Sequence, residues 1–94
     1  MKVYWSQDAQ RQLAAIHQYI AQSSTDYANR MVERLMSRSE QIAIFPFSGR
    51  RVPEYDLPQI RELFEGPYRL IYRICSDHIE ILLVLHGARD ARLG

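Results

Sequence analysis

An alternation of hydrophobic and charged residues from Tyr68 to His86 constrains the fold of this 94-residue chain more than any other segment does. Successive side chains of a β-strand point to opposite faces, so the even-numbered residues that follow Tyr68 would extend an apolar and aromatic face. Arg69 and Arg73 fall on the opposite face. A Ser-Asp pair in the middle of the segment is typical of a turn, and the segment is therefore predicted to be an antiparallel hairpin.

A third strand is predicted to precede this hairpin. Residues 60–64 form a short hydrophobic run, and a Glu-Gly-Pro sequence at 65–67 separates that run from the hairpin with a strong turn signal. Three consecutive strands therefore form a predicted meander. The proline-bordered connection at residues 50–58 is expected to be irregular, with Glu54 and Asp56 exposed to solvent.

The first half of the chain carries helical patterns. A short strand is expected at residues 2–5, and Ser6 or Asp8 can cap the helix that follows, because both side chains accept hydrogen bonds from free backbone N–H groups. Apolar residues then recur at the spacing of an amphipathic helix. They are Ala9, Leu13, Ile16 and Ile20. A polar break at residues 23–26 starts a second helix, which ends before Pro46 because proline removes a backbone donor.

The predicted element order is β-α-α-β-β-β, in a single domain that spans residues 1–94. A pair of helices set apart from a run of strands is typical of the α+β class, in which the helices cover one face of the sheet. We therefore expect an N-terminal strand and an antiparallel helix hairpin packed on a small, mostly antiparallel sheet. The opposite sheet face would be left for a ligand or a partner.

Composition restricts the class of protein. Hydrophobic residues make up 47% of the chain, and the single cysteine, Cys75, excludes an intramolecular disulfide. No apolar run approaches the ~20 residues that span a bilayer, and the N-terminus shows no secretory signal, so we expect a cytoplasmic protein without membrane contact. A net charge of +1 is low for a protein that binds mainly to nucleic-acid backbones.

Several short motifs follow one another along nearly the whole chain. They are Trp5, the helix stripe at 13–20, Phe45-Pro46, Gly49-Arg50, Ile60-Arg61-Glu62-Leu63, the strand from Tyr68 to Arg73, and Ile79-Glu80-Ile81 leading to His86 and Arg89. In this order and spacing the chain resembles the RelE/ParE superfamily, the toxins of bacterial type II toxin-antitoxin pairs. The resemblance implies the RelE/ParE toxin fold, no metal or cofactor, and a cognate antitoxin with a DNA-binding N-terminal part.

The superfamily has two functional branches. RelE-like members are ribosome-dependent endonucleases that cleave mRNA, whereas ParE-like members bind and inhibit DNA gyrase without being enzymes. Metal-free RNA cleavage needs groups for proton transfer and cations for the phosphate. In a nuclease, proton transfer would fall to His86 or Glu62, and phosphate binding to Arg61, Arg69 and Arg73. Strand alternation would allow Arg69, Arg73 and His86 to share the sheet face that the helices leave open.

Three features favour the ParE-like branch. Lys2 is the only lysine among twelve basic residues, the net charge is close to zero, and the tail after His86 has no aromatic side chain that could stack on a base. The ending from His86 to Arg89 also resembles ParE-type members. We therefore expect a gyrase inhibitor with no catalytic residues.

The expected contacts to gyrase or to the antitoxin lie on the arginine-bearing strands and in the C-terminal segment. They are Arg61, Arg69, Arg73, His86, Arg89, Arg92 and Leu93. Leu93 and the exposed edge of the meander would offer docking places for a disordered, acidic antitoxin tail that folds on binding. A RelE-like nuclease, with the ribosome and mRNA as partners, is the first alternative. An inactive homologue that acts only in an antitoxin complex is the second.

Overall fold

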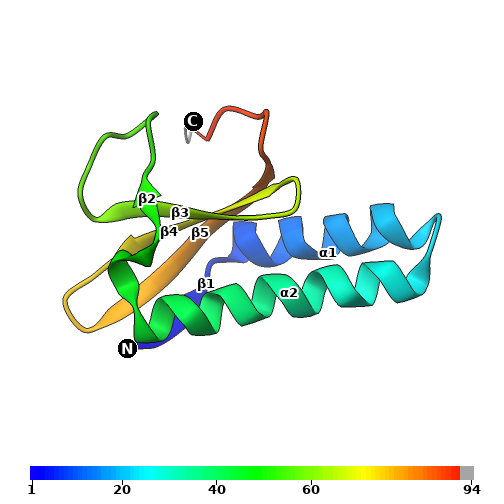
Figure 1. Cartoon of the computed structure of the whole chain (residues 1–94), viewed down its shortest axis with the longest axis horizontal. Helices are drawn as coiled ribbons and strands as arrows, with labels where there is room; N and C mark the ends of the chain where they lie inside the picture. The colour runs from blue at the N-terminus through cyan, green and yellow to red at the C-terminus, as the bar shows by residue number, and fades with distance from the viewer. Residues whose placement is uncertain (92–94) are drawn as a thin grey trace.

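The computed structural model describes residues 1–91 and shows two helices packed against one face of a five-stranded sheet (Figure 1). The elements in chain order are β1 (Lys2–Trp5), α1 (Gln7–Ala21), α2 (Thr25–Ile44), the short 3-10 helix η1 (Pro46–Ser48), β2 (Arg50–Arg51), β3 (Ile60–Glu65), β4 (Tyr68–Ile74) and β5 (His78–His86). This order confirms the predicted α+β class and adds η1 and β2 to it. Within residues 1–91, no helix combines the length and the apolar character needed to cross a bilayer.

The strands are arranged in the order β1-β5-β4-β3-β2. β1 runs parallel to β5, and the remaining neighbours are antiparallel, so the predicted meander of β3, β4 and β5 is confirmed. The prediction of an irregular connection at residues 50–58 is wrong at its start, because Arg50 and Arg51 pair with Glu62 and Arg61. β2 therefore covers part of the meander edge that we expected to be exposed.

Both helices begin at the polar residues that the sequence offers as caps. The Ser6 side chain accepts a hydrogen bond from the N–H of Ala9 at 3.0 Å, and the Ser24 side chain accepts one from the N–H of Tyr27 at 3.1 Å. Each cap satisfies a backbone donor that a helix leaves free in its first turn. The polar break between the two helices is confirmed as the connection between α1 and α2.

The main hydrophobic core lies between the helices and the sheet. Leu35 of α2, Leu70 and Tyr72 of β4 and Ile79 of β5 are all fully buried in it. Each such side chain contributes about 1.5–3 kcal/mol through removal of apolar surface from water. The even-numbered residues of β4 face the helices, as strand alternation predicts.

A smaller apolar cluster covers the other face of the sheet. Val52, Ile71, Leu83 and Leu85 are buried there together with Ala91 near the C-terminus. The connection between β2 and β3 therefore folds back over the strands, and the expectation of an open sheet face is wrong. The physical reason is that Ile71, Leu83 and Leu85 point outward from the sheet. Covering their side chains removes apolar area from contact with water.

A β-bulge in β5 changes which side chains face the helices. Ile71 pairs with Leu83 and Tyr72 with Ile81, so Leu82 is an extra residue in its strand. The Ser6 hydroxyl donates to the Leu82 carbonyl at 2.9 Å, which attaches the start of α1 to the bulge. Beyond the bulge, the assignment of β5 side chains to the two faces of the sheet is shifted by one residue.

Candidate functional site

A network of ion pairs lies on the sheet face opposite the helices. Arg69 of β4 is only 5% exposed; its Nε donates to Glu62 Oε1 at 2.7 Å, and its two terminal nitrogens donate to the Glu54 carboxylate at 2.9 Å each. Arg50 donates from Nε to the other Glu62 oxygen at 2.7 Å. We call Arg50, Glu62, Arg69 and Glu54 the Arg69 network. Its two positive and two negative charges balance.

Pairing favours the charged states of Glu54 and Arg69. The hydrogen bonds from Arg69 lower the pKa of Glu54 to about 2, and the N–H of Ala91, 3.0 Å from the same carboxylate, acts in the same direction. The contact with Glu54 in turn raises the pKa of Arg69. Arg69 also donates to the carbonyl of Arg89 at 3.0 Å. All three guanidinium nitrogens therefore have acceptors within the fold, and the network fastens both the β2–β3 connection and residues 89–91 of the C-terminal segment.

The two other candidate phosphate ligands lie apart from Arg69. Arg73, on the outer face of β4, is half-exposed and paired with Glu80 of β5, and this pairing raises its pKa. Arg61 leaves β3 on the face opposite to Glu62. Its Nε donates to the Pro58 carbonyl at 2.8 Å, and its guanidinium lies 5.0 Å from the centre of the Phe47 ring.

His86 is on the helix side of the sheet, because the bulge displaces the alternation of β5. Its ring lies edge-on to Tyr68, with 6.2 Å between the ring centres. The prediction that His86 shares a face with Arg69 and Arg73 is therefore wrong. His86 instead borders a groove of about 400 Å³ between α1 and the ends of β4 and β5, to which α1 contributes Ile16 and Tyr19.

The C-terminal candidates are only partly described. Arg89 is exposed and also lines the groove beside His86, while its backbone carbonyl accepts the hydrogen bond from Arg69. Arg92 and Leu93 lie outside the described residues, so their predicted contacts stay predictions.

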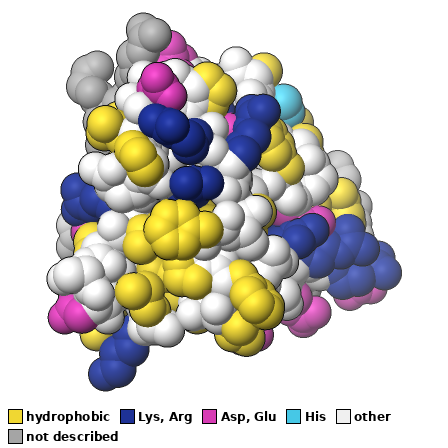
Figure 2. Space-filling model, turned by 60° about the vertical axis from the view of Figure 1, so that its left-hand side comes forward, with side chains coloured by type: hydrophobic (Ala, Val, Ile, Leu, Met, Phe, Trp, Pro, Cys, Tyr) yellow, Lys and Arg dark blue, Asp and Glu magenta, His cyan; other side chains and the backbone are white. Residues whose placement is uncertain are grey.

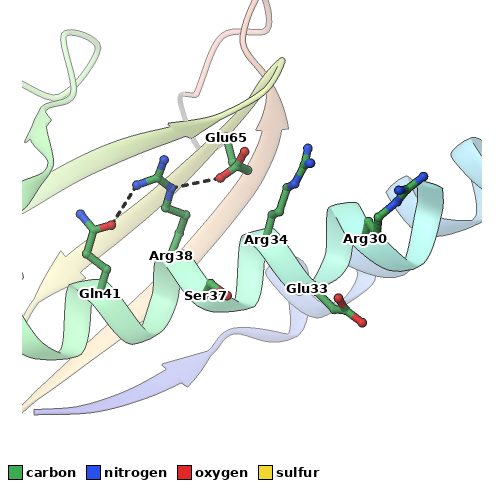
Figure 3. Close-up of a pocket in the computed structure, with 7 residues that line it drawn as sticks. All are labelled: Arg30, Glu33, Arg34, Ser37, Arg38, Gln41 and Glu65. Carbon is green, nitrogen blue, oxygen red and sulfur yellow. Dashed lines mark hydrogen bonds and ion pairs between the residues drawn. The ribbon is translucent and has the colours of Figure 1, made fainter. Parts of the chain in front are cut away.

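A second hollow, of about 470 Å³, follows the polar side of α2 (Figure 3). Arg38 donates to Glu65 at 3.1 Å and to Gln41 at 2.9 Å, and Arg30 and Arg34 extend from the same helix beside it. The hollow is open and lined by mixed charges, and none of its lining residues is a histidine or a cysteine. It offers charged contacts to a partner and no pair of nucleophile and base.

Hydrophobic side chains gather on the surface where α2 ends, and arginine or lysine side chains lie beside them (Figure 2). Ile44, Phe45 and Phe47 are 70%, 62% and 64% exposed. The Arg61 guanidinium over Phe47 brings positive charge to the border of this patch. We call residues 44–47 the apolar surface. Exposed apolar patches with a polar rim are typical of protein interaction sites.

Comparison with known proteins decides the family. Residues 3–91 match the model of the family described as the ParE toxin of the type II toxin-antitoxin system, parDE. The chain belongs to the ParE toxin family. It is therefore the toxin of a type II toxin-antitoxin pair in the RelE/ParE superfamily, as the sequence resemblance implied, and this membership implies a cognate antitoxin as its partner.

Two relatives match the ParE-family toxin over most of their own length. The toxin homologue Y4kP of Sinorhizobium fredii is 36% identical over 88 residues, which cover 92% of this chain and 88% of the relative. Toxin RelE2 of Caulobacter vibrioides is 33% identical over 89 residues, which cover 94% and 97%. One of these two relatives thus carries the RelE name, whereas the matching family model carries the ParE name.

Two solved structures share the fold of the ParE-family toxin. The chromosomal ParDE toxin-antitoxin system from P. aeruginosa aligns with a TM-score of 0.75 at 21% identity, covering 92% of this chain and 95% of that one. The YoeB/ParE toxin from Agrobacterium tumefaciens aligns with a TM-score of 0.65 at 16% identity, covering 92% and 98%. At these identities the likeness shows the fold alone.

Arg50 and Glu54 are the members of the Arg69 network that sequence reasoning did not select, and the environment predicted for Glu54 was wrong. We expected a solvent-exposed loop residue, whereas the Glu54 side chain is 16% exposed and binds Arg69 through both oxygens. A usable signal was the arginine inside a hydrophobic strand, because a buried guanidinium needs more than one acceptor. The choice of Glu54 as that acceptor depends on the β2–β3 connection folding back, which no local pattern indicates.

Proposed function

We propose that this ParE-family toxin inhibits DNA gyrase by binding to it, without cleaving RNA, and that its cognate antitoxin neutralises it. The observation that carries the proposal is the buried Arg69 network. A metal-free nuclease needs cations and proton-transfer groups that reach a bound phosphate. Arg69 is instead saturated by carboxylates and a carbonyl inside the fold, and Glu62 is only 1% exposed.

The remaining nuclease candidates also lie in separate parts of the molecule. His86 lies on the helix side of the sheet, Arg61 is directed toward η1, and Arg73 is paired with Glu80 on the outer face. Arg73 is separated from the other two by the sheet. His86 and Arg61 share the helix side but lie at opposite ends of β4, since His86 pairs with Tyr68 and Arg61 with Tyr72. This separation supports a protein that acts by binding.

The exposed features suit contacts with other proteins. The apolar surface presents two phenylalanine rings beside Arg61, and aromatic side chains with arginine are the groups that most often contribute strongly to protein interfaces. In this proposal Arg61, Arg73, His86 and Arg89 contact gyrase or the antitoxin, and Arg92 and Leu93 belong to the same set. Arg69 contributes indirectly, because it holds the C-terminal segment in place.

The groove beside His86 is the proposed binding site of the antitoxin segment. Its walls combine apolar groups such as Ile16 and Val84 with the exposed cation Arg89. An amphipathic acidic segment would place apolar side chains in the groove and a carboxylate near Arg89. The ordering of such a segment on binding would explain how a small antitoxin covers a large toxin surface.

A RelE-like ribosome-dependent nuclease is the second candidate function. It is favoured by the relative named RelE2, at 33% identity, and by the exposure of His86, which leaves one proton-transfer group accessible. An inactive homologue that only forms an antitoxin complex is the third.

The experiment tests gyrase and translation in parallel with the same purified toxin. Incubation with gyrase and supercoiled or relaxed plasmid is expected to accumulate cleaved DNA or to block supercoiling, and added antitoxin is expected to reverse the effect. A cell-free translation reaction with a reporter mRNA is expected to keep its transcript intact. Cleaved transcripts with unaffected gyrase would overturn the proposal in favour of the nuclease, and no effect in either assay would favour the inactive homologue.

Two variants separate the mechanisms. His86→Gln would reduce a nuclease that uses this histidine by ~10² or more, whereas we expect a much smaller effect on gyrase inhibition. Phe45→Ala removes an exposed ring from the apolar surface and is expected to weaken gyrase inhibition. Met36→Ala, at an exposed apolar residue on α2 away from that surface, is the matched control and should leave inhibition unchanged.

A further inference from the structure

A cluster of potential metal ligands lies at the closed end of the β4–β5 hairpin. Cys75, His78 and Glu80 each offer one ligand atom, and these atoms all lie within 4.8 Å of one another. All three residues are half-buried, so a hydrated ion could reach them. We propose that this cluster is a Zn²⁺-binding site, a property that does not depend on the target of the toxin.

The hairpin itself brings the three side chains together. The N–H of Cys75 donates to the carbonyl of His78 at 2.9 Å, which places the two residues opposite each other where the strands meet. Glu80 follows His78 by two residues along β5, so both side chains leave the strand on the same face. The connection projects from the end of the sheet in Figure 1, away from the buried core.

The donor set suits zinc. Thiolate, imidazole and carboxylate are the three side-chain groups that bind Zn²⁺, at about 2.3, 2.0–2.1 and 2.0–2.2 Å respectively. Ligand atoms around a tetrahedral ion at such distances lie about 3.3–3.8 Å apart. Small side-chain rotations at the end of a hairpin bring the cluster to that spacing, and water completes the fourth position. The Cys75 thiol loses its proton when the sulfur binds the ion.

A carboxylate already orients the histidine. Nδ1 of His78 lies 2.7 Å from Oδ1 of Asp77. Histidines that bind metals usually donate their second ring N–H to such a carboxylate, which fixes the tautomer and the ring orientation. With the proton on Nδ1, the lone pair of Nε2 is available to the metal.

A cation already occupies the cluster in the form of Arg73. Its guanidinium pairs with Glu80. The Arg73 side chain is 46% exposed, and ion pairs this close to solvent are weak. Zn²⁺ would displace the guanidinium to solvent while keeping Glu80 and Cys75 as its own ligands.

Cobalt titration of the tag-free chain tests the site, because Co²⁺ bound to a thiolate absorbs in the near-ultraviolet and is displaced by Zn²⁺. We expect this band to appear and then to disappear as Zn²⁺ is added. Zn²⁺ at about 100 times its Kd should also raise the Tm by roughly 10 °C, since only the folded chain forms the site. Cys75→Ser and His78→Gln should lose both signals.

Arg73→Gln should change Zn²⁺ binding in the opposite direction from Cys75→Ser and His78→Gln. Removing the guanidinium frees Glu80 and takes a positive charge away from the site, so Zn²⁺ binding should become tighter. His17→Gln is the matched control, because His17 lies on the helices, where its ring is hydrogen-bonded to Asn29. This variant should leave both signals unchanged.

Three results would overturn the site. The first is that the unmodified chain shows neither the cobalt band nor a thermal shift. The second is that both signals persist in His78→Gln. The third is that Arg73→Gln binds Zn²⁺ more weakly than the unmodified chain. Circular dichroism of each metal-free variant shows whether it is folded. If Cys75→Ser fails to fold, the test rests on His78→Gln and Arg73→Gln.

Discussion

The two faces of the central sheet are buried by different means. The helix face is covered by apolar side chains such as Leu35 and Leu70, whereas the outer face combines a small apolar cluster with the Arg69 network. Apolar burial is non-directional, so a core of this kind tolerates volume-conserving exchanges among apolar side chains. Buried charges need partners at fixed positions, so the outer face depends on a few specific residues.

This contrast explains the position of the functional surfaces. The carboxylates and guanidinium that would suit catalysis hold the β2–β3 connection and the C-terminal segment on the sheet. The exposed apolar surface and the groove beside His86 are formed by other elements, at the end of α2 and beside α1. Stability of the outer face and contact with partners are therefore assigned to different residues.

The largest expected effect comes from Arg69→Met. Glu54 and Glu62 would lose a shared cation while staying largely inaccessible to water, and breaking a buried pair in this way costs about 3–5 kcal/mol. Urea unfolding at neutral pH measures the loss. Arg73→Met is the control on the same strand face, and its exposed pair should cost less than about 1 kcal/mol. Equal losses for the two variants would show that burial of the network does not distinguish the outer face.

The second-largest expected effect comes from a substitution on the helix face. Leu35→Ala removes a fully buried side chain from the main core and is expected to cost about 2–5 kcal/mol, because it leaves a cavity. The same unfolding measurement applies, and the loss should not change between pH 3 and pH 7, since no charge is involved. The neighbouring Met36→Ala, at a 41% exposed residue, should stay within about 0.5 kcal/mol. A loss that varies with pH would contradict an apolar origin.

Acid should weaken the outer face selectively. The pKa of Glu54 falls from 4.5 to about 2 on folding, so its contribution is complete above the unfolded value and is lost as the pH falls from about 5 toward 2. The shift corresponds to about 3 kcal/mol. In Glu54→Gln this part of the pH dependence should disappear, and stability curves of the two proteins should converge near pH 2. Curves that stay parallel over this range would exclude Glu54 as the titrating group.

The smallest expected effect concerns a link between the main core and the edge of the sheet. The Tyr72 hydroxyl donates to the Pro46 carbonyl at 2.6 Å and accepts from the Gly49 N–H at 3.0 Å, which joins the main core to η1 and the start of β2. Tyr72→Phe should cost about 1–2 kcal/mol, because buried backbone groups lose their partner. Tyr4→Phe, at a 53% exposed residue, serves as the comparison in thermal unfolding and should change little.

Local patterns in the sequence predicted the elements and much of the packing. The stripe from Ala9 to Ile20, the capping candidates at Ser6 or Asp8 and within residues 23–26, and the turn before β4 depend on neighbouring residues alone, so they could be recognised before folding. The alternation in β4 correctly assigned Tyr68 and Tyr72 to the helix face and Arg69 to the other. The family resemblance followed from the order of these motifs and was confirmed by the family match.

The placement of His86 required the tertiary structure. Residues 79–85 of β5 are apolar apart from Glu80, so either face could be the buried one, and the sequence contained no mark of an extra residue. The bulge at Leu82 is held by Ser6, and the N–H of Val84 donates to Gln12 at 2.7 Å. Both contacts join residues more than seventy positions apart, which is beyond the reach of any local pattern.

The sequence by itself determined the helices, the meander and the toxin family, because these depend on short-range periodicity and on the order of motifs. Only the tertiary structure decided that Arg69 belongs to a buried network and that Cys75, His78 and Glu80 converge at the hairpin end. The physical reason is that charge pairing and ligand convergence depend on distances between side chains. Those distances are set only when the strands have paired and the β2–β3 connection has folded over them.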